Sequence, residues 1–191
     1  NPGCYATIMQ LILAPFVEQL GGVPAVFGVS GHSGTGAKPS PLNDAEHLSD
    51  NLIPYKLIGH IHEREATRHL GYPIRFMPHV HPAYRGLLIT AHLPMAKPIS
   101  IDDATAALET AYRNEPLVDL RIEPPELRDG AGIPGVVMGG VEVSADGHHV
   151  VVVGAEDNLL KGAAVQAVQN LNLALGLAEL TGIDARPRIA S

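Results

Sequence analysis

The single cysteine of this 191-residue chain, Cys4, is the first side chain whose position suggests covalent chemistry. It follows Asn1-Pro2-Gly3; Asn is a good helix N-cap, and Pro suits the first helical position. The sequence therefore predicts that Cys4 lies in the first turn of a helix. Unpaired N–H groups and the positive end of the helix dipole favour the thiolate there. The thiolate is the nucleophilic form, although a lone cysteine often serves only as a small apolar residue.

Two closely spaced histidine pairs are candidates for proton transfer or metal binding. His60 and His62 precede Glu65, which could orient an imidazole or tune its charge, and His79 and His81 form the second pair. Histidine is the natural general acid–base near neutral pH. A zinc hydrolase with four histidine ligands is an alternative, but the chain has no His-Glu-x-x-His motif and the cysteine would be unexplained. With ten histidines present, surface or hydrogen-bonded structural roles must also be weighed.

A glycine-rich segment and one arginine could bind an anion. The segment Ser30–Gly36 has three glycines and three hydroxyl side chains, and such loops let backbone N–H groups approach a phosphate. It is neither a Rossmann fingerprint nor a P-loop, because no Gly-Lys-Ser/Thr ending is present. A flexible surface loop is the alternative. Arg85, between two expected strands, could hold an anionic group through two hydrogen bonds, or could be an ordinary surface arginine.

The elements that must position these groups are helices and strands in irregular order. Apolar spacing and end signals predict helices beginning at residue 1 and covering 63–70, 100–112 and 158–182. Strands are expected at 24–30, 53–58, 73–80, 86–93, 117–122, 136–144 and 148–154, with Asp146-Gly147 as the clearest hairpin turn. The pattern predicts an α+β domain with a mixed, largely antiparallel sheet.

Composition narrows the function classes. Apolar residues make up 46% and charged residues 17%, which predicts extensive buried surface. The formal net charge is −7, and aromatic residues are scarce, so neither nucleic-acid binding nor a base-stacking platform is expected. No apolar stretch is long enough to cross a membrane, and one cysteine cannot form an internal disulfide. We therefore expect a cytoplasmic or organellar protein, and a start at Asn rather than Met suggests processing or a fragment.

Five motifs, in order and spacing, resemble those of N-acetyl-γ-glutamyl-phosphate reductases. They are Asn1–Thr7, Val29–Gly36, His60–Glu65, Pro78-His79-Val80 followed by Arg85-Gly86, and Asp157–Ala164 followed by Gln166 and Gln169-Asn170. The resemblance covers nearly all of the chain. The segments Lys38–Pro41 and Asp50–Tyr55 are similar to the fungal-type branch, which is often fused to acetylglutamate kinase.

The resemblance implies a fold and a division of the chain. Residues 1–157 would form a glyceraldehyde-3-phosphate-dehydrogenase-like catalytic and dimerisation domain. Residues 158–183 would be the C-terminal helix that normally packs on a Rossmann domain, and 184–191 a flexible tail. The Rossmann domain that precedes the cysteine motif in the family is missing here, so the isolated chain is expected to be inactive without that N-terminal half.

The resemblance also implies roles for ten residues. The expected reaction is NADPH-dependent reduction of N-acetyl-γ-glutamyl phosphate to the semialdehyde, with phosphate release, through a cysteine thioester in arginine biosynthesis. The catalytic residues would be Cys4, His62, His60 and Glu65. Substrate would be held by Arg85 and Ser30, and NADP by Gly31, Ser33, Gly34 and Asn158. No metal is expected.

Other readings stay open at this point. A reductase of the same fold could instead act on LysW-aminoadipate phosphate or aspartyl phosphate. The chain could also be a non-catalytic dimerisation or regulatory fragment. A homodimer or homotetramer is expected, with a small-molecule acyl phosphate as substrate and no nucleic-acid or membrane partner. The expected location is the cytoplasm, or the mitochondrion if the source is a fungus.

Overall fold

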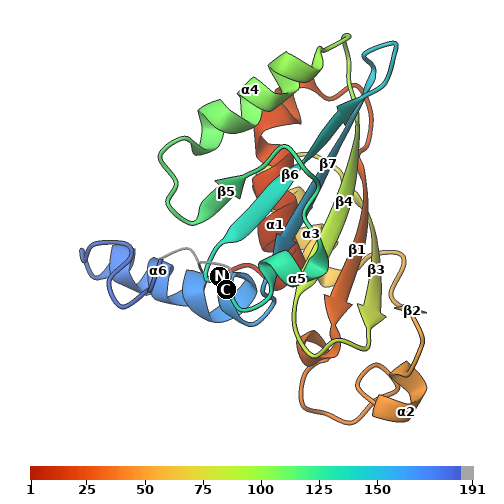
Figure 1. Ribbon diagram of the computed structural model, residues 1–191, viewed down its shortest axis with the longest axis vertical. Helices are drawn as coiled ribbons and strands as arrows, with labels where there is room; N and C mark the ends of the chain where they lie inside the picture. The colour runs from red at the N-terminus through yellow and green to blue at the C-terminus, as the bar shows by residue number, and fades with distance from the viewer. Residues whose placement is uncertain (186–191) are drawn as a thin grey trace.

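A computed structural model describes residues 1–185, and its centre is a seven-stranded sheet with helices packed on one face (Figure 1). The helices are α1 (Cys4–Leu13), α2 (Ala45–Leu48), α3 (Ile61–Leu70), α4 (Ile101–Tyr112), α5 (Leu127–Gly130) and α6 (Val165–Ala174). The strands are β1 (Ala25–Gly31), β2 (Ile53–Pro54), β3 (Arg75–His81), β4 (Leu87–Pro94), β5 (Val118–Leu120), β6 (Val136–Val143) and β7 (His149–Glu156). Short 3-10 helices cover Ala14–Gln19 and His32–Thr35, and a π-helical turn covers Leu160–Ala164.

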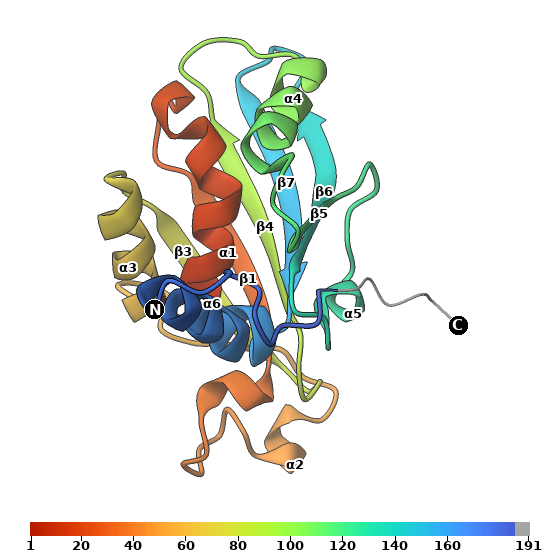
Figure 2. The same cartoon turned by 90° about the vertical axis from the view of Figure 1, so that its left-hand side faces the viewer.

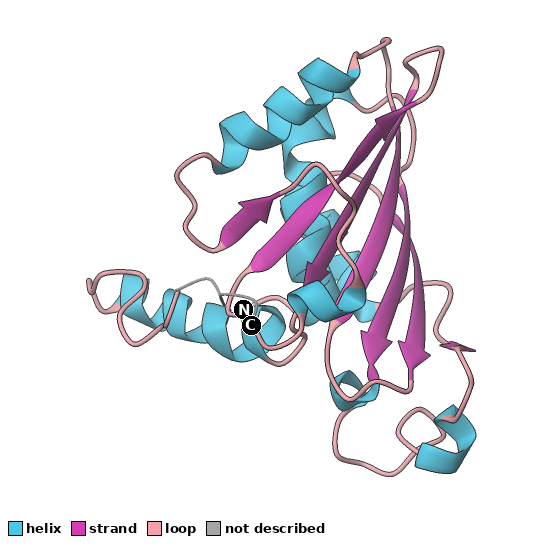
Figure 3. Ribbon diagram, viewed as in Figure 1, coloured by secondary structure: helices cyan, strands magenta, loops and turns pink. Residues whose placement is uncertain are grey.

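The sheet is mixed and largely antiparallel, as the sequence predicts. Its order is β2-β3-β1-β4-β7-β6-β5, and β1/β3 and β5/β6 are the parallel pairs (Figure 3). The remaining neighbours pair antiparallel, including the β6–β7 hairpin. Gly147 in the turn of this hairpin has a φ of +74°, which glycine adopts without strain. The hairpin predicted at Asp146-Gly147 is therefore confirmed.

Helices α1, α3, α4 and α6 lie on the same side of the sheet, as Figure 2 shows. The core between α1 and the sheet contains Ile8, Met9, Ile12 and Leu13 of the helix, all fully buried. Strand positions alternate between this core and the opposite face, which is typical of a sheet covered on one side. Within residues 1–185, no helix is long and apolar enough to cross a membrane.

The N-cap of α1 differs from the prediction, whereas the position of Cys4 in the first helical turn does not. The N-cap is Gly3, and Asn1 instead accepts a hydrogen bond from Asn170 Nδ2 at 3.0 Å. Asn1 is therefore not the helix cap, and Pro2 is not the first helical residue. Cys4 still lies in the first helical turn, as predicted, and the α-helix ends at Leu13, just before Pro15.

The C-terminal helix differs more strongly from the prediction. A helix was expected over 158–182, but α6 ends at Ala174 and is preceded by the π turn. Its expected apolar face is exposed: Val168 by 38%, Leu171 by 56% and Leu175 by 64%. The buried side chains of α6 are instead mostly polar, because they form hydrogen bonds with α1 and with the segment after α6; they are Val165, Gln166, Gln169 and Asn172.

The proposed division at residue 157 stays a prediction. The end of β7 is linked to the π turn at this point, because the Asp157 carboxylate accepts hydrogen bonds from the backbone N–H groups of Leu159 and Leu160 at 2.8 and 3.2 Å. Of the tail expected at 184–191, residues 186–191 lie outside the described part of the chain.

Candidate active site

Cys4 is the first residue of α1 and is half-buried. The π turn packs against it, because a methyl carbon built on Gly162 would lie only 2.6 Å from Cys4 Cβ. Burial, and next the carboxylate of Glu156, raise the pKa of the Cys4 thiol to about 12, whereas the N–H groups of Tyr5 and Cys4 act in the opposite direction. The predicted effect of the helix start is present but is outweighed by burial. The resting thiol is therefore protonated, and the expectation of a lowered pKa is wrong.

His62, in the first turn of α3, meets the chain immediately before Cys4. A Cβ built on Gly3 would lie 2.1 Å from His62 Nε2, so only glycine allows the imidazole to pack so close to the start of α1. Burial lowers the pKa of His62 below 6.5, although the Glu65 carboxylate acts in the opposite direction. His62 is thus neutral at neutral pH and can accept a proton. Its Nδ1 is buried and has no hydrogen-bond partner among the described residues.

Glu65 binds the backbone at the same place. Its Oε2 accepts a hydrogen bond from the Gly3 N–H at 3.0 Å. The carboxylate therefore fixes the turn that carries the thiol, and it influences both histidines through its charge. Glu65 was expected from the sequence to orient an imidazole or to tune its charge; its charge does act on both histidines, whereas its hydrogen bond is to the main chain.

His60 is the N-cap of α3. Its Nδ1 accepts a hydrogen bond from the His62 N–H at 3.1 Å, and its side chain is buried. Burial, and next the charges of His62 and Lys56, lower the pKa of His60 to about 4, although the Glu65 carboxylate acts in the opposite direction. Protonation would also remove the acceptor that caps the helix. The two histidines, whose rings are 4.7 Å apart, therefore have different positions: His60 caps the helix, and His62 lies beside Gly3.

The glycine-rich loop and the Arg85 loop are held together by Asn158. Its Oδ1 accepts from the Gly86 N–H at 2.9 Å, and its Nδ2 donates to Ser33 Oγ at 2.9 Å. Gly31 also packs against the Arg85 loop, where an added Cβ would lie 2.8 Å from Arg85 Cα. The structure thus brings together the substrate and cofactor residues predicted from the sequence, and it shows that the buried Asn158 amide bridges two loops.

Arg85 is anchored at one end of this loop pair. One guanidinium nitrogen lies 3.4 Å from Asp157 Oδ2, and the arginine side chain is 41% exposed. Asp157 is fully buried, but Gly132 also donates to its carboxylate, at 2.6 Å. The guanidinium can therefore bind an anion from solvent while the carboxylate keeps it in place.

The four-histidine zinc arrangement does not form. His79 Nδ1 lies 3.1 Å from the Met77 carbonyl oxygen, and His81 Nδ1 accepts from the Ala83 N–H. His60 caps the start of α3 through its Nδ1, and His62 packs against Gly3. Among residues 1–185, no group of three or more His, Cys, Asp or Glu side chains is arranged to hold a metal.

Glu156, the last residue of β7, was not among the residues predicted from the sequence. It is fully buried, and neither carboxylate oxygen has a hydrogen-bond partner within the described residues. Gly162 separates it from Cys4, since an added Cβ there would lie 2.7 Å from Glu156 Oε1. The signal was available: Val150, Val152, Gly154 and Glu156 occupy alternate positions facing the helices, so an acid stands where the pattern requires an apolar residue.

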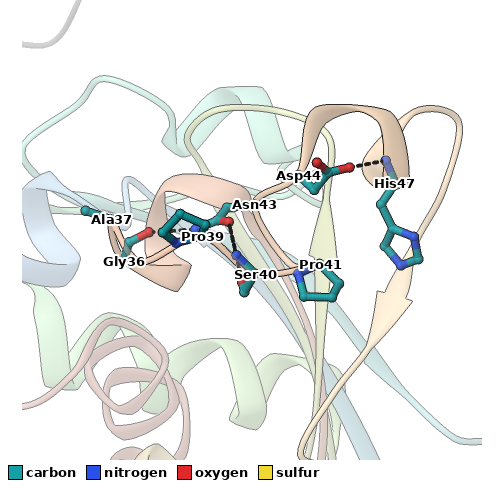
Figure 4. Close-up of a pocket in the computed structure, with 8 residues that line it drawn as sticks. All are labelled: Gly36, Ala37, Pro39, Ser40, Pro41, Asn43, Asp44 and His47. Atoms are coloured by element: carbon teal, nitrogen blue, oxygen red, sulfur yellow. Dashed lines mark hydrogen bonds between the residues drawn. The ribbon is translucent and has the colours of Figure 1, made fainter.

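A cavity of about 680 Å³ lies elsewhere, in the loop after β1 (Figure 4). Its lining includes Asp44 and His47, and the loop is held by Asn43, which donates to the Gly36 and Lys38 carbonyl oxygens. Cys4 and His62 do not line it. The cavity is therefore not the site of the chemistry described above.

Comparison with protein families gives one match over most of the chain. Residues 4–158 match the family described as "Semialdehyde dehydrogenase, dimerisation domain". An N-acetyl-gamma-glutamyl-phosphate reductase of Xanthomonas oryzae pv. oryzae is 51% identical over 96% of this chain and 58% of its own length. "Protein arg-6, mitochondrial" of Neurospora crassa is also 51% identical over 96% of this chain, but over 21% of its own length. The chain thus spans less than two thirds of these relatives.

Solved structures show the same fold at low sequence identity. Aspartate semialdehyde dehydrogenase II of Vibrio cholerae superposes with a TM-score of 0.75 and 20% identity, covering 92% of this chain and 62% of that protein. A probable aspartate-semialdehyde dehydrogenase of Pseudomonas aeruginosa has a TM-score of 0.74 and 19% identity over 92% and 61% of the two chains. These similarities confirm the predicted α+β architecture.

Proposed function

Because this chain belongs to the semialdehyde dehydrogenase dimerisation-domain family, we propose that it is the thiol-bearing part of an acyl-phosphate reductase. The proposed reaction is the NADPH-dependent reduction of N-acetyl-γ-glutamyl phosphate to the semialdehyde. The observation that carries the proposal is that the His62 imidazole packs against Gly3, the residue immediately before Cys4. The 51% identity to N-acetyl-gamma-glutamyl-phosphate reductases supports this substrate over aspartyl or LysW-aminoadipate phosphate.

The proposed chemistry begins with proton transfer. His62 takes the proton of Cys4, and Cys4 Sγ forms a bond to the acyl carbon of the substrate. The bond from that carbon to the phosphate oxygen breaks, and inorganic phosphate leaves with the electron pair of that bond and takes up a proton from solvent. After reduction of the resulting thioester, the carbon–sulfur bond breaks, the aldehyde departs, and His62 returns the proton to the sulfur. Glu65 keeps the thiol in place through its hydrogen bond with Gly3.

The glycine-rich loop fits the reactive end of a nicotinamide. Gly34 is exposed, and a Cβ there would lie 3.1 Å from Ser30 Oγ and 3.3 Å from Asn158 Nδ2. The exposed Gly34 backbone therefore lies directly over the polar side chains of Ser30 and Asn158. Gly31, Ser33 and Gly34 would hold the ring, and Asn158 would keep the loop in shape. When bound, the nicotinamide supplies the hydride. The family comparison supports a nicotinamide cofactor, and the choice of NADP belongs to the proposal.

The face of the sheet opposite helices α1, α3, α4 and α6 supports a dimer. Apolar and aromatic side chains are partly exposed there, including Phe27, which is 40% exposed and packs on His79 at 4.4 Å between ring centres. A matched family named for dimerisation fits such a surface. We propose a homodimer or homotetramer, located in the cytoplasm, or in the mitochondrion as the name of the Neurospora relative indicates.

Arg85→Gln is expected to raise the KM for the acyl phosphate by about 10- to 100-fold while changing kcat less, because a charge-assisted contact to an anion is lost. Arg85→Lys should recover part of the affinity, since lysine keeps the charge but not the paired donors. Steady-state kinetics in the intact protein measure both constants. Asp157 keeps its three backbone donors, so the fold should persist. An unchanged KM in both variants would remove Arg85 from the substrate site.

The proposed substrate is tested by comparing three acyl phosphates in separate assays. The intact protein is given NADPH with N-acetyl-γ-glutamyl phosphate, aspartyl phosphate or LysW-aminoadipate phosphate, and kcat/KM is compared. The highest value is expected for the first substrate. A clear preference for another would keep the reaction type and change the substrate, and no turnover of any of them would contradict the proposed function.

A further inference from the structure

The carboxyl group of Glu156 lies in the apolar core between the sheet and the helices. Its side chain points to the same side of β7 as Val150 and Val152, which are fully buried beneath the helices, and it is itself 0% exposed. In the sheet register it stands beside Leu87 of β4 and Val136 of β6, both buried. Neither Oε1 nor Oε2 has a hydrogen-bond partner in the part of the chain that the structure describes.

Such surroundings favour the uncharged acid. An ionised carboxylate without hydrogen bonds is strongly disfavoured in an apolar interior. Burial accordingly raises the pKa of Glu156 well above its usual range; the Lys161 ammonium acts against this shift, and Asp157 adds to it. Lys161 does not form a hydrogen bond with Glu156. Its Nζ donates to Gln169 Oε1 at 2.7 Å instead.

Glu156 and Cys4 approach the same point from two elements. A methyl carbon built on Gly162 would lie 2.6 Å from Cys4 Cβ and 2.7 Å from Glu156 Oε1. The π turn makes this approach possible, with the Gly162 N–H bonded to the Asp157 carbonyl oxygen at 3.0 Å. Ionised Glu156 is the largest influence on the Cys4 thiol after burial, and it raises the pKa of that thiol.

Charged and titratable groups reach this pair from several elements, and Tyr5 of α1 and Tyr55 after β2 both interact with the Cys4 thiolate. On the π turn, Lys161 favours ionisation of Glu156. Next along the chain, Asp157 opposes it, and the charge of Asp157 is partly balanced by Arg85. On α3, Glu65 is a second carboxylate that disfavours the Cys4 thiolate. A negative charge on Glu156, in addition to that on Glu65, makes the thiolate harder still to form.

We propose that Glu156 is a positioning residue for Cys4: its unpartnered carboxyl group is held behind the thiol across Gly162 as a neutral acid, and ionisation of that group suppresses the thiolate. The role of Glu156 in catalysis rests on the proposed function. The charge state of the carboxyl group and its influence on the thiol do not, and both can be measured without turnover.

The first measurement is the infrared spectrum of the intact protein near pH 7. Exposed carboxyl groups are ionised there, because their usual pKa values are about 4. A carbonyl band of a protonated carboxylic acid is expected in the wild type and should be lost in Glu156→Gln. The exposed Glu142 provides the matched control, since Glu142→Gln should keep the band. No such band in the folded wild type would overturn the proposal, even if the Glu156 variant failed to fold.

The second measurement is the rate at which iodoacetamide alkylates the peptide containing Cys4, compared between Glu156→Gln and wild type. The ratio of the two rates should be close to one near pH 7 and should rise on the order of tenfold as the pH is raised until the Glu156 carboxyl group of the wild type ionises. A ratio already high near pH 7 would mean that Glu156 is ionised. A ratio that stays at one, or falls below it, would mean that its charge does not act on the thiol. Either result overturns the proposal, and neither depends on whether acyl phosphates are substrates.

Discussion

Cys4→Ser is expected to abolish acyl-phosphate reduction, lowering kcat by about 10⁴-fold or more, because the covalent step has no nucleophile of comparable reactivity. A serine hydroxyl is far harder to ionise than a thiol, and the burial that already raises the pKa of Cys4 would disfavour an alkoxide further. Steady-state kinetics of the intact protein, with substrate binding measured separately, give the loss.

The fold should tolerate this change. Cys4 is small and half-buried, and the Gly162 contact is to its Cβ, which serine retains. The far-UV circular dichroism spectrum and the thermal unfolding midpoint of Cys4→Ser should therefore stay close to those of the wild type. Full activity in a folded Cys4→Ser protein would show that the reaction does not pass through this residue.

His62→Asn should lower kcat by about 10²- to 10⁴-fold, the usual contribution of general acid–base catalysis. The pH dependence identifies the cause. Burial lowers the pKa of His62 below 6.5, so the wild-type base is lost only as pH falls beneath that value, and the rate should decline on that acid side. In the variant this decline should disappear, and the rate should instead rise with pH as the thiol ionises unaided.

His60→Asn is the matched control for this prediction. An asparagine at the N-cap can accept the hydrogen bond that His60 Nδ1 accepts from the His62 N–H, so α3 should keep its start. Activity is therefore expected to change by less than about tenfold, with the acid decline preserved. If His60→Asn lost the decline and His62→Asn kept it, the roles of the two histidines would be reversed.

Local patterns predict much of this fold because they act over a few residues. The turn at Asp146-Gly147 requires a positive φ that glycine supplies, and Ser100 caps α4 by accepting from the Asp103 N–H at 3.1 Å. The stop of α3 at Gly71, which has a φ of +66°, follows from the same rule. The position of Cys4 in a first helical turn was likewise predictable, although not its cap.

Features that depend on distant contacts were not predictable from spacing alone. The apolar stripe of α6 suggested a buried face, but Gln166 turns the polar side inward by donating to Thr7 Oγ1, 159 positions away in the chain, at 2.6 Å. The pKa of Cys4 depends on burial and on Glu156, which the sheet places next to it. The division of work between His60 and His62 became visible only when the packing at Gly3 was known.

The most direct test is to mix the intact protein with N-acetyl-γ-glutamyl phosphate in the absence of nicotinamide and to analyse the Cys4 peptide by mass spectrometry while measuring released phosphate. Formation of a thioester requires only the thiol, the base and the acyl phosphate. One N-acetylglutamyl group on Cys4 and one released phosphate are expected for each subunit, with neither in Cys4→Ser. Phosphate release without acylation of Cys4, or acylation of another residue, would contradict it.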